Sequence, residues 1–529
     1  MIERVPARYG RHVGTVILAN AVLGVAAVAR EVVLAANWGT SPLADAYLLA
    51  MYLPDFVGHL LVGSVLHLAA VPFLARAAHQ SLEHLDRASR RLMVEVAVVM
   101  GVFAVACGIA APSLIRLLGP GLTPAMQGQA VAFLRWMLPA LVFYPLYGLG
   151  SGRHLARGSF WQPACGPVVL ATTVVVSLAV AARTGRLELM GLGHALGTAA
   201  MCALQLGRWV VRPGPAMATA GFHPAPVYRA ALPLGLAVVA GQFAVGVERA
   251  VASGLGAGTI AALNYAVKVV NFPLWIFVTA ITTVTFAELS QHAADGDRPG
   301  AIRRTLAALR LVLFVSTPLA VATFFLRRQV LAVLFGYGAF DAAAVAISAR
   351  VLAGYALFVP AGAIVFILSR SFHARSEFRV PLRAAVAGAG LMAALLVTMP
   401  ARLGPAALGW AATGGAWLHA GVLGLVARSQ LDVTWQRLGR GSAQLLVAVL
   451  PPALVAWLAA RFVGDAWLVA PVLARAMGAG LVAVTVSAAY IAGCALSGIR
   501  WPEEFSLLGK SALQPGQAHR SHPVGRAGS

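Results

Sequence analysis

The chain has 529 residues, of which 60% are hydrophobic and only 11% are charged, and its formal net charge is +22. A soluble domain has about 25% charged residues, so this composition excludes an ordinary soluble globular protein. Apolar runs long enough to cross a bilayer recur from end to end, which predicts an all-α polytopic membrane protein.

We expect about fourteen transmembrane helices joined by short segments, with no extramembrane domain large enough to hold a core. The first run carries Arg30 and Glu31, so it is expected to remain as a helix and not to be removed as a signal peptide. The expected spans lie near residues 13–36, 43–74, 92–115, 129–151, 160–182, 188–210, 229–254, 260–289, 305–326, 346–369, 379–399, 405–427, 443–463 and 468–495.

Arginines gather in alternate loops, before the first span and after each even-numbered span up to the twelfth. Because short loops rich in Arg and Lys stay on the cytoplasmic side, both termini are predicted to be cytoplasmic. The same placement explains the large positive charge, so we expect no binding of nucleic acid. The four cysteines lie in apolar runs without metal or redox spacing, and no metal site is expected.

An internal repeat divides the chain. At an offset of 219 residues, Arg30, Gly39, Thr40, Asp45 and Pro54 recur as Arg249, Gly258, Thr259, Asn264 and Pro273. Spans 1–6 and 7–12 are therefore predicted to form two pseudo-symmetric six-helix lobes, residues 1–215 and 216–430. Residues 431–500 would add two further helices, and the polar residues 501–529 would form a disordered cytoplasmic tail.

Three basic residues lie inside apolar spans: Arg30, Arg249 and Lys268. Charges at that depth are costly, so they usually face a cavity or a partner. If the two lobes face each other, these cations converge on a central cavity, and a phosphate or pyrophosphate is the natural ligand of such a cluster.

The alternative is that the same cations only hold helices together. Three acidic residues, Glu31, Asp45 and Glu248, are placed to pair with them. Both interpretations can be true if the acid–base pairs separate during a transport cycle.

Two glycines and two prolines occupy equivalent places in the repeat. Gly39 and Gly258 are expected at tight turns or close helix contacts between the paired helices. Pro54 and Pro273 lie inside long spans and are expected to kink them, which suits helices that bend during alternating access.

Patterns of catalytic residues are absent from the sequence. It has no Gly-rich phosphate loop, no HExxH motif and no nucleophile elbow. We therefore expect a protein that is not an enzyme and that has no cofactor.

Four segments resemble motifs of one known family. They are residues 30–56, residues 248–273 (ERAVASGLGAGTIAALNYAVKVVNFP), residues 334–345 (LFGYGAFDAAAV) and residues 367–381. The sequence is similar to the MurJ/MviN virulence-factor family of the multidrug/oligosaccharidyl-lipid/polysaccharide exporter superfamily, from about residue 13 to residue 430.

The resemblance implies a flippase in the bacterial cytoplasmic (inner) membrane. It would move undecaprenyl-pyrophosphate-linked glycan, by default the peptidoglycan precursor lipid II, by alternating access of a V-shaped cavity. Spans 13 and 14 would form a groove for the lipid tail. In this comparison Arg30 matches a cavity arginine, Lys268 stands where the family usually has arginine, and Asp45 matches an aspartate of the second helix.

The first lobe departs from the family pattern. Ala21, Gly58 and His59 stand where the family has arginines. A flippase of exopolysaccharide or O-antigen repeat units therefore remains an alternative. A cation-coupled drug exporter and a non-transporting scaffold of an envelope-synthesis complex are the others. The expected partners are the lipid-linked glycan, membrane lipids and envelope-synthesis proteins. Na⁺, H⁺ or the membrane potential would supply the energy.

Overall fold

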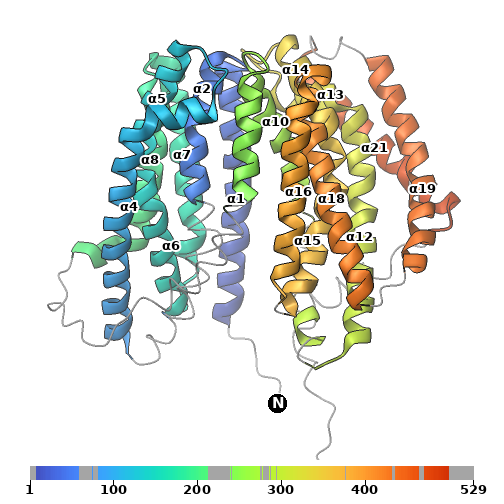
Figure 1. Cartoon of the computed structure of the whole chain (residues 1–529), viewed down its shortest axis with the longest axis horizontal. Coiled ribbons are helices and arrows are strands. Elements are labelled where there is room, and N and C mark those ends of the chain that lie inside the picture. Colours follow the sequence, from blue (N-terminus) through green and yellow to red (C-terminus); the bar gives the residue numbers. More distant parts are fainter. Residues whose placement is uncertain are drawn as a thin grey trace, which may run out of the picture.

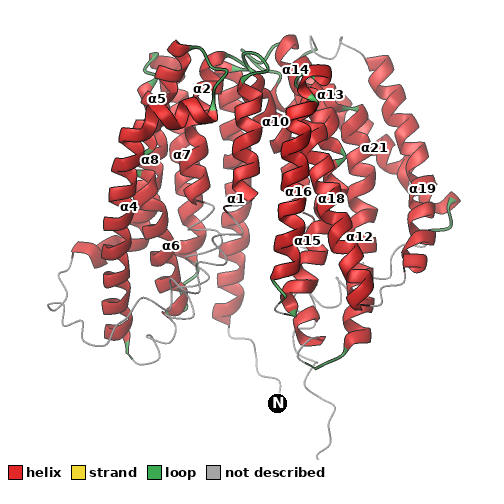
Figure 2. Ribbon diagram, viewed as in Figure 1, coloured by secondary structure: helices red, strands yellow, loops and turns green. Residues whose placement is uncertain are grey.

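The computed structural model consists of helices packed side by side into two bundles (Figures 1 and 2). Every regular element among the residues that it describes is a helix. The described residues are 7–58, 74, 81–211, 239, 241–274, 277, 281, 285, 288–292, 295–375, 377–431, 435–463 and 470–499.

The first bundle contains the helices of the N-terminal part of the chain. Helix α1 packs on α7, α2 packs on α5, and α8 contacts α5, α6 and α7. These helices are α1 (Ala7–Trp38), α2 (Pro42–Gly58), α4 (Leu82–Leu118), α5 (Pro124–Met137), α6 (Ala140–Ala156), α7 (Trp161–Thr184) and α8 (Glu188–Val211).

The second bundle begins with a helical segment at residues 241–253. Helix α18 is central to it, because α14, α15 and α16 all pack against it. Its other helices are α10 (Thr259–Pro273), α12 (Arg298–Phe325), α13 (Arg327–Phe335), α14 (Ala342–Ala356), α15 (Phe358–Ala374), α16 (Arg379–Thr398), α17 (Pro400–Leu403) and α18 (Ala406–Leu431).

A C-terminal helix pair, α19 (Trp435–Val463) and α21 (Val472–Leu496), packs on the outside of the second bundle. Helix α19 lies against α12, and α21 contacts α19 and α13. The apolar contact includes Leu445 and Tyr490, and the Tyr490 hydroxyl donates to the carbonyl of Phe314 at 2.7 Å. The pair is therefore attached to the second bundle through α12 and α13.

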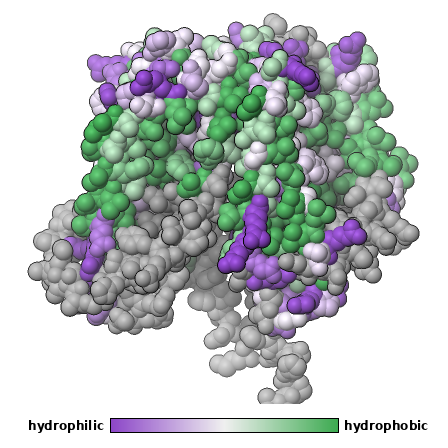
Figure 3. Space-filling view, viewed as in Figure 1, coloured by the Kyte–Doolittle hydropathy of each residue, from purple (hydrophilic) through white to green (hydrophobic). Residues whose placement is uncertain are grey.

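Apolar side chains cover the middle of the visible surface, and hydrophilic side chains gather towards its two ends (Figure 3). Nine candidate spans within the described residues are long and apolar enough to cross a membrane, and the pair α14 and α15, bent by 42°, makes a tenth. The predicted all-α membrane fold is confirmed. The count of fourteen stays a prediction, because the expected spans near 43–74, 229–254 and 260–289 overlap residues outside the described ones.

Polar N-caps mark where several of these helices begin. Asp341 accepts the N–H of Ala344 at the start of α14, and Thr123 accepts that of Met126 at the start of α5. Asp297 caps α12 by accepting the N–H of Gly300, which holds the pKa of this carboxyl below its usual value. Such caps satisfy backbone groups that the first turn leaves unpaired.

The packing does not test the division of the chain at residues 215, 430 and 500, which stays a prediction. The polar segment 501–529 lies outside the described residues.

Candidate functional site

The two bundles meet at one end, where each contributes a tight turn. We call this region the closed end: the turn at residues 39–41, the turn at 254–258 and the loop at 336–340. Gly39 and Gly258 both adopt left-handed backbone conformations, with φ of 51° and 85°. A Cβ atom on Gly258 would lie 2.1 Å from the Thr40 carbonyl oxygen of the other bundle. A side chain at this position would therefore force the bundles apart.

Asp45 of α2 closes this end by capping a helix of the other bundle. Its two carboxylate oxygens accept the N–H groups of Gly258 at 2.6 Å and of Ala261 at 2.7 Å, at the start of α10. The side chain is buried, with 1% of its surface exposed. A carboxylate is stabilised there because the first N–H groups of a helix lack partners and carry partial positive charge.

Further hydrogen bonds join the bundles close by. The Tyr265 hydroxyl of α10 donates to the carbonyl of Gly39 at 3.1 Å. The N–H of Ala339 donates to the carbonyl of Ala36, near the end of α1, at 2.7 Å. Tyr265 is also buried, so this hydrogen bond lies in the interior of the interface.

A charged cluster crosses the same interface through Glu31. This carboxylate accepts from Arg30 Nη2 at 2.6 Å and, with its other oxygen, from Asn264 Nδ2 at 2.8 Å. Lys268 Nζ of α10 lies 3.7 Å from Glu31 Oε1. The structure thus brings two of the predicted cations, one from each bundle, onto a single carboxylate.

The exposed fraction of the acidic side chain in this cluster is smaller than that of the two basic side chains. Glu31 is 5% exposed, whereas Arg30 is 20% and Lys268 is 41% exposed. The carboxylate is therefore the buried base of the cluster, and the two cations keep surface for another partner. Arg30 and Lys268 together carry two positive charges against the one negative charge of Glu31, and the carboxylate of Asp55 also acts electrostatically on Arg30.

Arg249 has different partners from Arg30 and Lys268. Its Nη1 donates to the carbonyl of Leu48 on α2 at 3.1 Å, and its guanidinium lies 5.2 Å from the centre of the Tyr52 ring. The Tyr52 hydroxyl donates back to the carbonyl of Gln242 at 2.5 Å. Arg249 therefore joins the bundles through α2, and no contact in the described part of the chain places it on Glu31.

Glu248 does not pair with its neighbour Arg249. Instead it is buried and accepts a hydrogen bond from the Tyr355 hydroxyl of α14, within the second bundle. In the structure Arg30 forms an ion pair with Glu31, and Asp45 accepts hydrogen bonds from backbone N–H groups of the other bundle.

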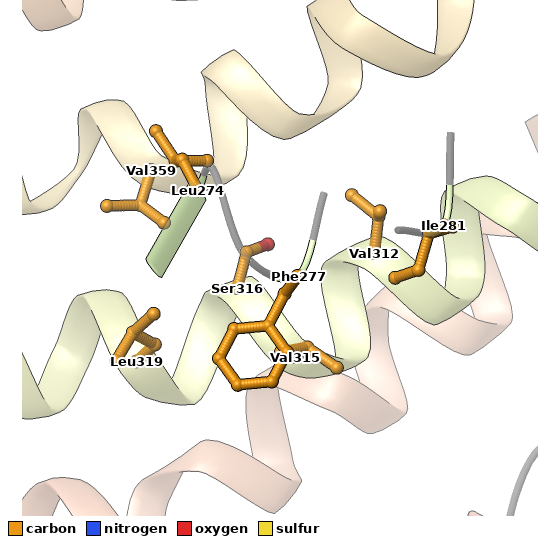
Figure 4. A pocket seen from close by; sticks show the side chains of 8 residues that line it. All are labelled: Leu274, Phe277, Ile281, Val312, Val315, Ser316, Leu319 and Val359. Atoms are coloured by element: carbon orange, nitrogen blue, oxygen red, sulfur yellow. The ribbon is translucent and has the colours of Figure 1, made fainter. Parts of the chain in front are cut away.

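The two prolines differ in their positions. Pro54 lies inside α2, which continues to Gly58, whereas α10 ends at Pro273. Beyond it, a small apolar pocket is lined by Leu274, Phe277 and Ile281 together with side chains of α12 and α15 (Figure 4).

Aromatic packing surrounds Gly58 in the first bundle, a position where the family resemblance implies an arginine. A Cβ atom on Gly58 would lie 3.2 Å from the ring of Tyr144, and the Tyr144 hydroxyl lies 3.2 Å from Nε2 of the buried His194. The second substituted position, His59, lies outside the described residues. A buried tyrosine–histidine pair that the sequence did not reveal therefore lies beside Gly58.

Asn264 is the main site residue that charge patterns missed. Its repeat equivalence to Asp45 was the available signal. Within the described ranges, no group of three His, Cys, Asp or Glu side chains gathers as metal ligands do.

A family model described as lipid II flippase MurJ matches residues 34–478. The lipid II flippase MurJ of Burkholderia cenocepacia is 27% identical over 375 residues, which cover 68% of this chain and 72% of that protein. A probable lipid II flippase MurJ of Rhizobium tropici is 26% identical over 433 residues, 79% of this chain and 81% of that protein.

Solved structures share the fold. A lipid II flippase MurJ in an inward closed conformation superposes with a TM-score of 0.73 at 18% identity, covering 91% of this chain and 98% of that one. An inward-facing multidrug resistance MATE family transporter of the MOP superfamily gives a TM-score of 0.64 at 16% identity, covering 78% and 94%. Because the family model spans most of the sequence, the chain belongs to the MurJ family.

Proposed function

We propose that the protein is a lipid II flippase of the bacterial cytoplasmic membrane, a transporter and not an enzyme. It would carry the undecaprenyl-pyrophosphate-linked peptidoglycan precursor from the inner to the outer leaflet. Family membership supports this proposal, together with relatives that are named as lipid II flippases.

The cluster around Glu31 is the observation that carries the mechanism. Arg30 and Lys268 come from different bundles, share one buried carboxylate and keep exposed surface. A pyrophosphate between the bundles would bind both cations and so compete with Glu31 for them. Binding would then change the contacts that join the bundles, which is what coupling of substrate to a conformational change requires.

Alternating access follows from the placement of this cluster. Asp45, Tyr265 and the loop at 336–340 hold the bundles together at the closed end. We assign this end to the outer side of the membrane, because the arginine-rich loops predict that both termini are cytoplasmic. The bundles, with the C-terminal pair attached to the second, would rock about the cluster to release substrate outside.

Arg249 takes a different role in this proposal. Its bonds to α2 make it part of the joint between the bundles, so its loss would alter the conformational balance as well as the charge of the site. Glu248, bound to Tyr355, would support the helical segment that carries Arg249.

The test is lipid II translocation in proteoliposomes that contain the purified chain. We expect Lys268→Ala and Arg30→Ala to reduce the rate at least tenfold, because each removes a charge-assisted bond worth about 1.5–3 kcal/mol. Arg402→Ala removes an exposed charge far from the cluster along the chain and serves as the control.

Cells provide the matching test of substrate. When a bacterium is depleted of its own lipid II flippase, the chain should restore growth, and the Lys268→Ala variant should not. Absence of rescue by a correctly inserted wild-type chain would contradict lipid II as substrate. Wild-type translocation rates in both cation variants would contradict the pyrophosphate site.

A further inference from the structure

An arginine of the C-terminal helix pair reaches the end of α13. Arg475 Nη1 donates to the carbonyl of Gly336 at 2.7 Å and to that of Ala332 at 3.1 Å. Its guanidinium carbon lies 5.4 Å from the centre of the Tyr337 ring, and its Nε donates to the carbonyl of Ala470 at 2.9 Å. Arg475 therefore binds two carbonyls at the C-terminal end of α13, where a positive charge is favoured, and fixes the loop that follows. The carbonyl of Ala332 also accepts the N–H of Gly336.

The same loop contacts the first bundle on its other side. The N–H of Ala339 donates to the carbonyl of Ala36 at 2.7 Å, and a Cβ atom on Gly338 would lie 2.2 Å from that carbonyl oxygen. Gly338 has a φ of 56°, so the loop reaches α1 in a conformation that favours glycine. The loop at 336–340 is thus held between α21 and α1.

Aromatic side chains pack together where this loop begins and ends. The ring centres of Phe335, which precedes the loop, and of Phe340, its last residue, both lie 5.1 Å from the ring centre of Tyr265. Tyr265 is the residue whose hydroxyl binds Gly39 of the first bundle. A displacement of the loop would therefore also disturb this second contact across the closed end.

We propose that Arg475 is a positioning residue that makes the C-terminal helix pair part of the gate at the closed end. The proposal rests on the alternating access proposed above. To open this end, the loop must leave Ala36, and Arg475 holds the loop in the position that contacts Ala36. Loss of Arg475 therefore favours the open conformation of this end. Movement of α21 changes the same balance in the intact protein.

The test measures the closed end directly, without substrate. Spin labels on Ala125→Cys and Ala401→Cys, two exposed positions at the starts of α5 and α17, report the distance between the bundles. The four native cysteines, Cys107, Cys165, Cys202 and Cys494, are first replaced by alanine. In lipid nanodiscs, Arg475→Ala should raise the ratio of long to short distances about five- to tenfold.

Arg461→Ala is the matched control. Arg461 is an exposed arginine in the last turn of α19, the other helix of the pair. Its loss should leave the distance distribution unchanged. An unchanged distribution in Arg475→Ala would overturn the proposal. If that variant does not fold, Arg475→Gln keeps a shorter donor, and the same two outcomes apply to it.

A double substitution tests whether Arg475 acts through the loop. Gly338→Ala breaks the loop–α1 contact directly, so it should also favour the open end. If Arg475 acts only by placing this loop, the variant with both changes should open no further than Gly338→Ala alone. If the two substitutions instead multiply each other's effect on the ratio of long to short distances, Arg475 does not act through the loop, and the proposed route is overturned. Lipid II translocation by the wild-type chain is a separate measurement, and its absence would contradict the proposed function without changing these distances.

Discussion

Replacement of Asp45 by asparagine should open the closed end of the molecule. In the structure this carboxylate uses one oxygen for the N–H of Gly258 and the other for the N–H of Ala261. Asparagine has nearly the same shape but only one oxygen that can accept. In Asp45→Asn, the amide nitrogen would therefore face one of these backbone donors inside a buried interface.

The cost follows from these contacts. A hydrogen bond to a charged group contributes about 1.5–3 kcal/mol, and a buried donor without a partner adds a penalty of similar size. Even a loss of about 2 kcal/mol corresponds to about a 30-fold change in an equilibrium constant. Because the bond joins different bundles, the loss affects the closed conformation and leaves the folding of each bundle nearly unchanged.

The same pair of spin labels measures the outcome. Asp45→Asn should convert much of the short-distance population to longer distances. Asp341→Asn is the control, because Asp341 caps α14 within one bundle through a single N–H, and asparagine is an equally good cap there. A distribution within twofold of wild type in Asp45→Asn would refute the reasoning that this carboxylate holds the end closed.

Two glycine substitutions test the packing of the interface and of the first bundle. Gly258→Ala should lower the melting temperature in detergent more than Gly185→Ala. Both glycines have left-handed backbone conformations, which cost about 1–2 kcal/mol for a residue with a side chain. Of the two, only Gly258 also contacts the other bundle. Gly58→Arg, which introduces the arginine that the family resemblance implies, should also lower the melting temperature, because overpacking against Tyr144 costs about 1–3 kcal/mol. A second change, Tyr144→Ala, should recover part of that loss; equal melting temperatures for wild type and Gly58→Arg would show that the ring gives way freely.

The architecture could be predicted from the sequence because it depends on simple physical requirements. Apolar runs of sufficient length must form helices in a membrane, since backbone groups find no water there. The repeat of Gly39 and Gly258, and of Asp45 and Asn264, indicated two similar units. The packing of the C-terminal pair on α12 and α13 could not be derived in this way, because an apolar helix face carries no information about its partner.

Contacts across the interface were harder to predict for a related reason. Glu31 and Asn264 are 233 positions apart, and no local pattern states that their side chains meet. Arg475 shows the same limit: an arginine in an apolar helix indicates a polar partner, but its partners are backbone carbonyls, which every residue has. Sequence patterns identify the side chain that needs a partner and leave the partner open.

One difference between the two charged pairs of the repeat could, however, be read from the sequence, because the acidic and basic residues stand in opposite order. Glu31 follows Arg30, whereas Glu248 precedes Arg249. Successive residues of an α-helix are about 100° apart, so carboxylates on opposite sides of equivalent arginines point in directions about 200° apart. Glu31 accordingly reaches across to Asn264, while Glu248 turns into its own bundle and binds Tyr355. Of these two carboxylates, Glu31 is the one that lies in the interface between the bundles. In the proposed mechanism it therefore holds the charges that an anion would take over, whereas Glu248 supports the helical segment that carries Arg249.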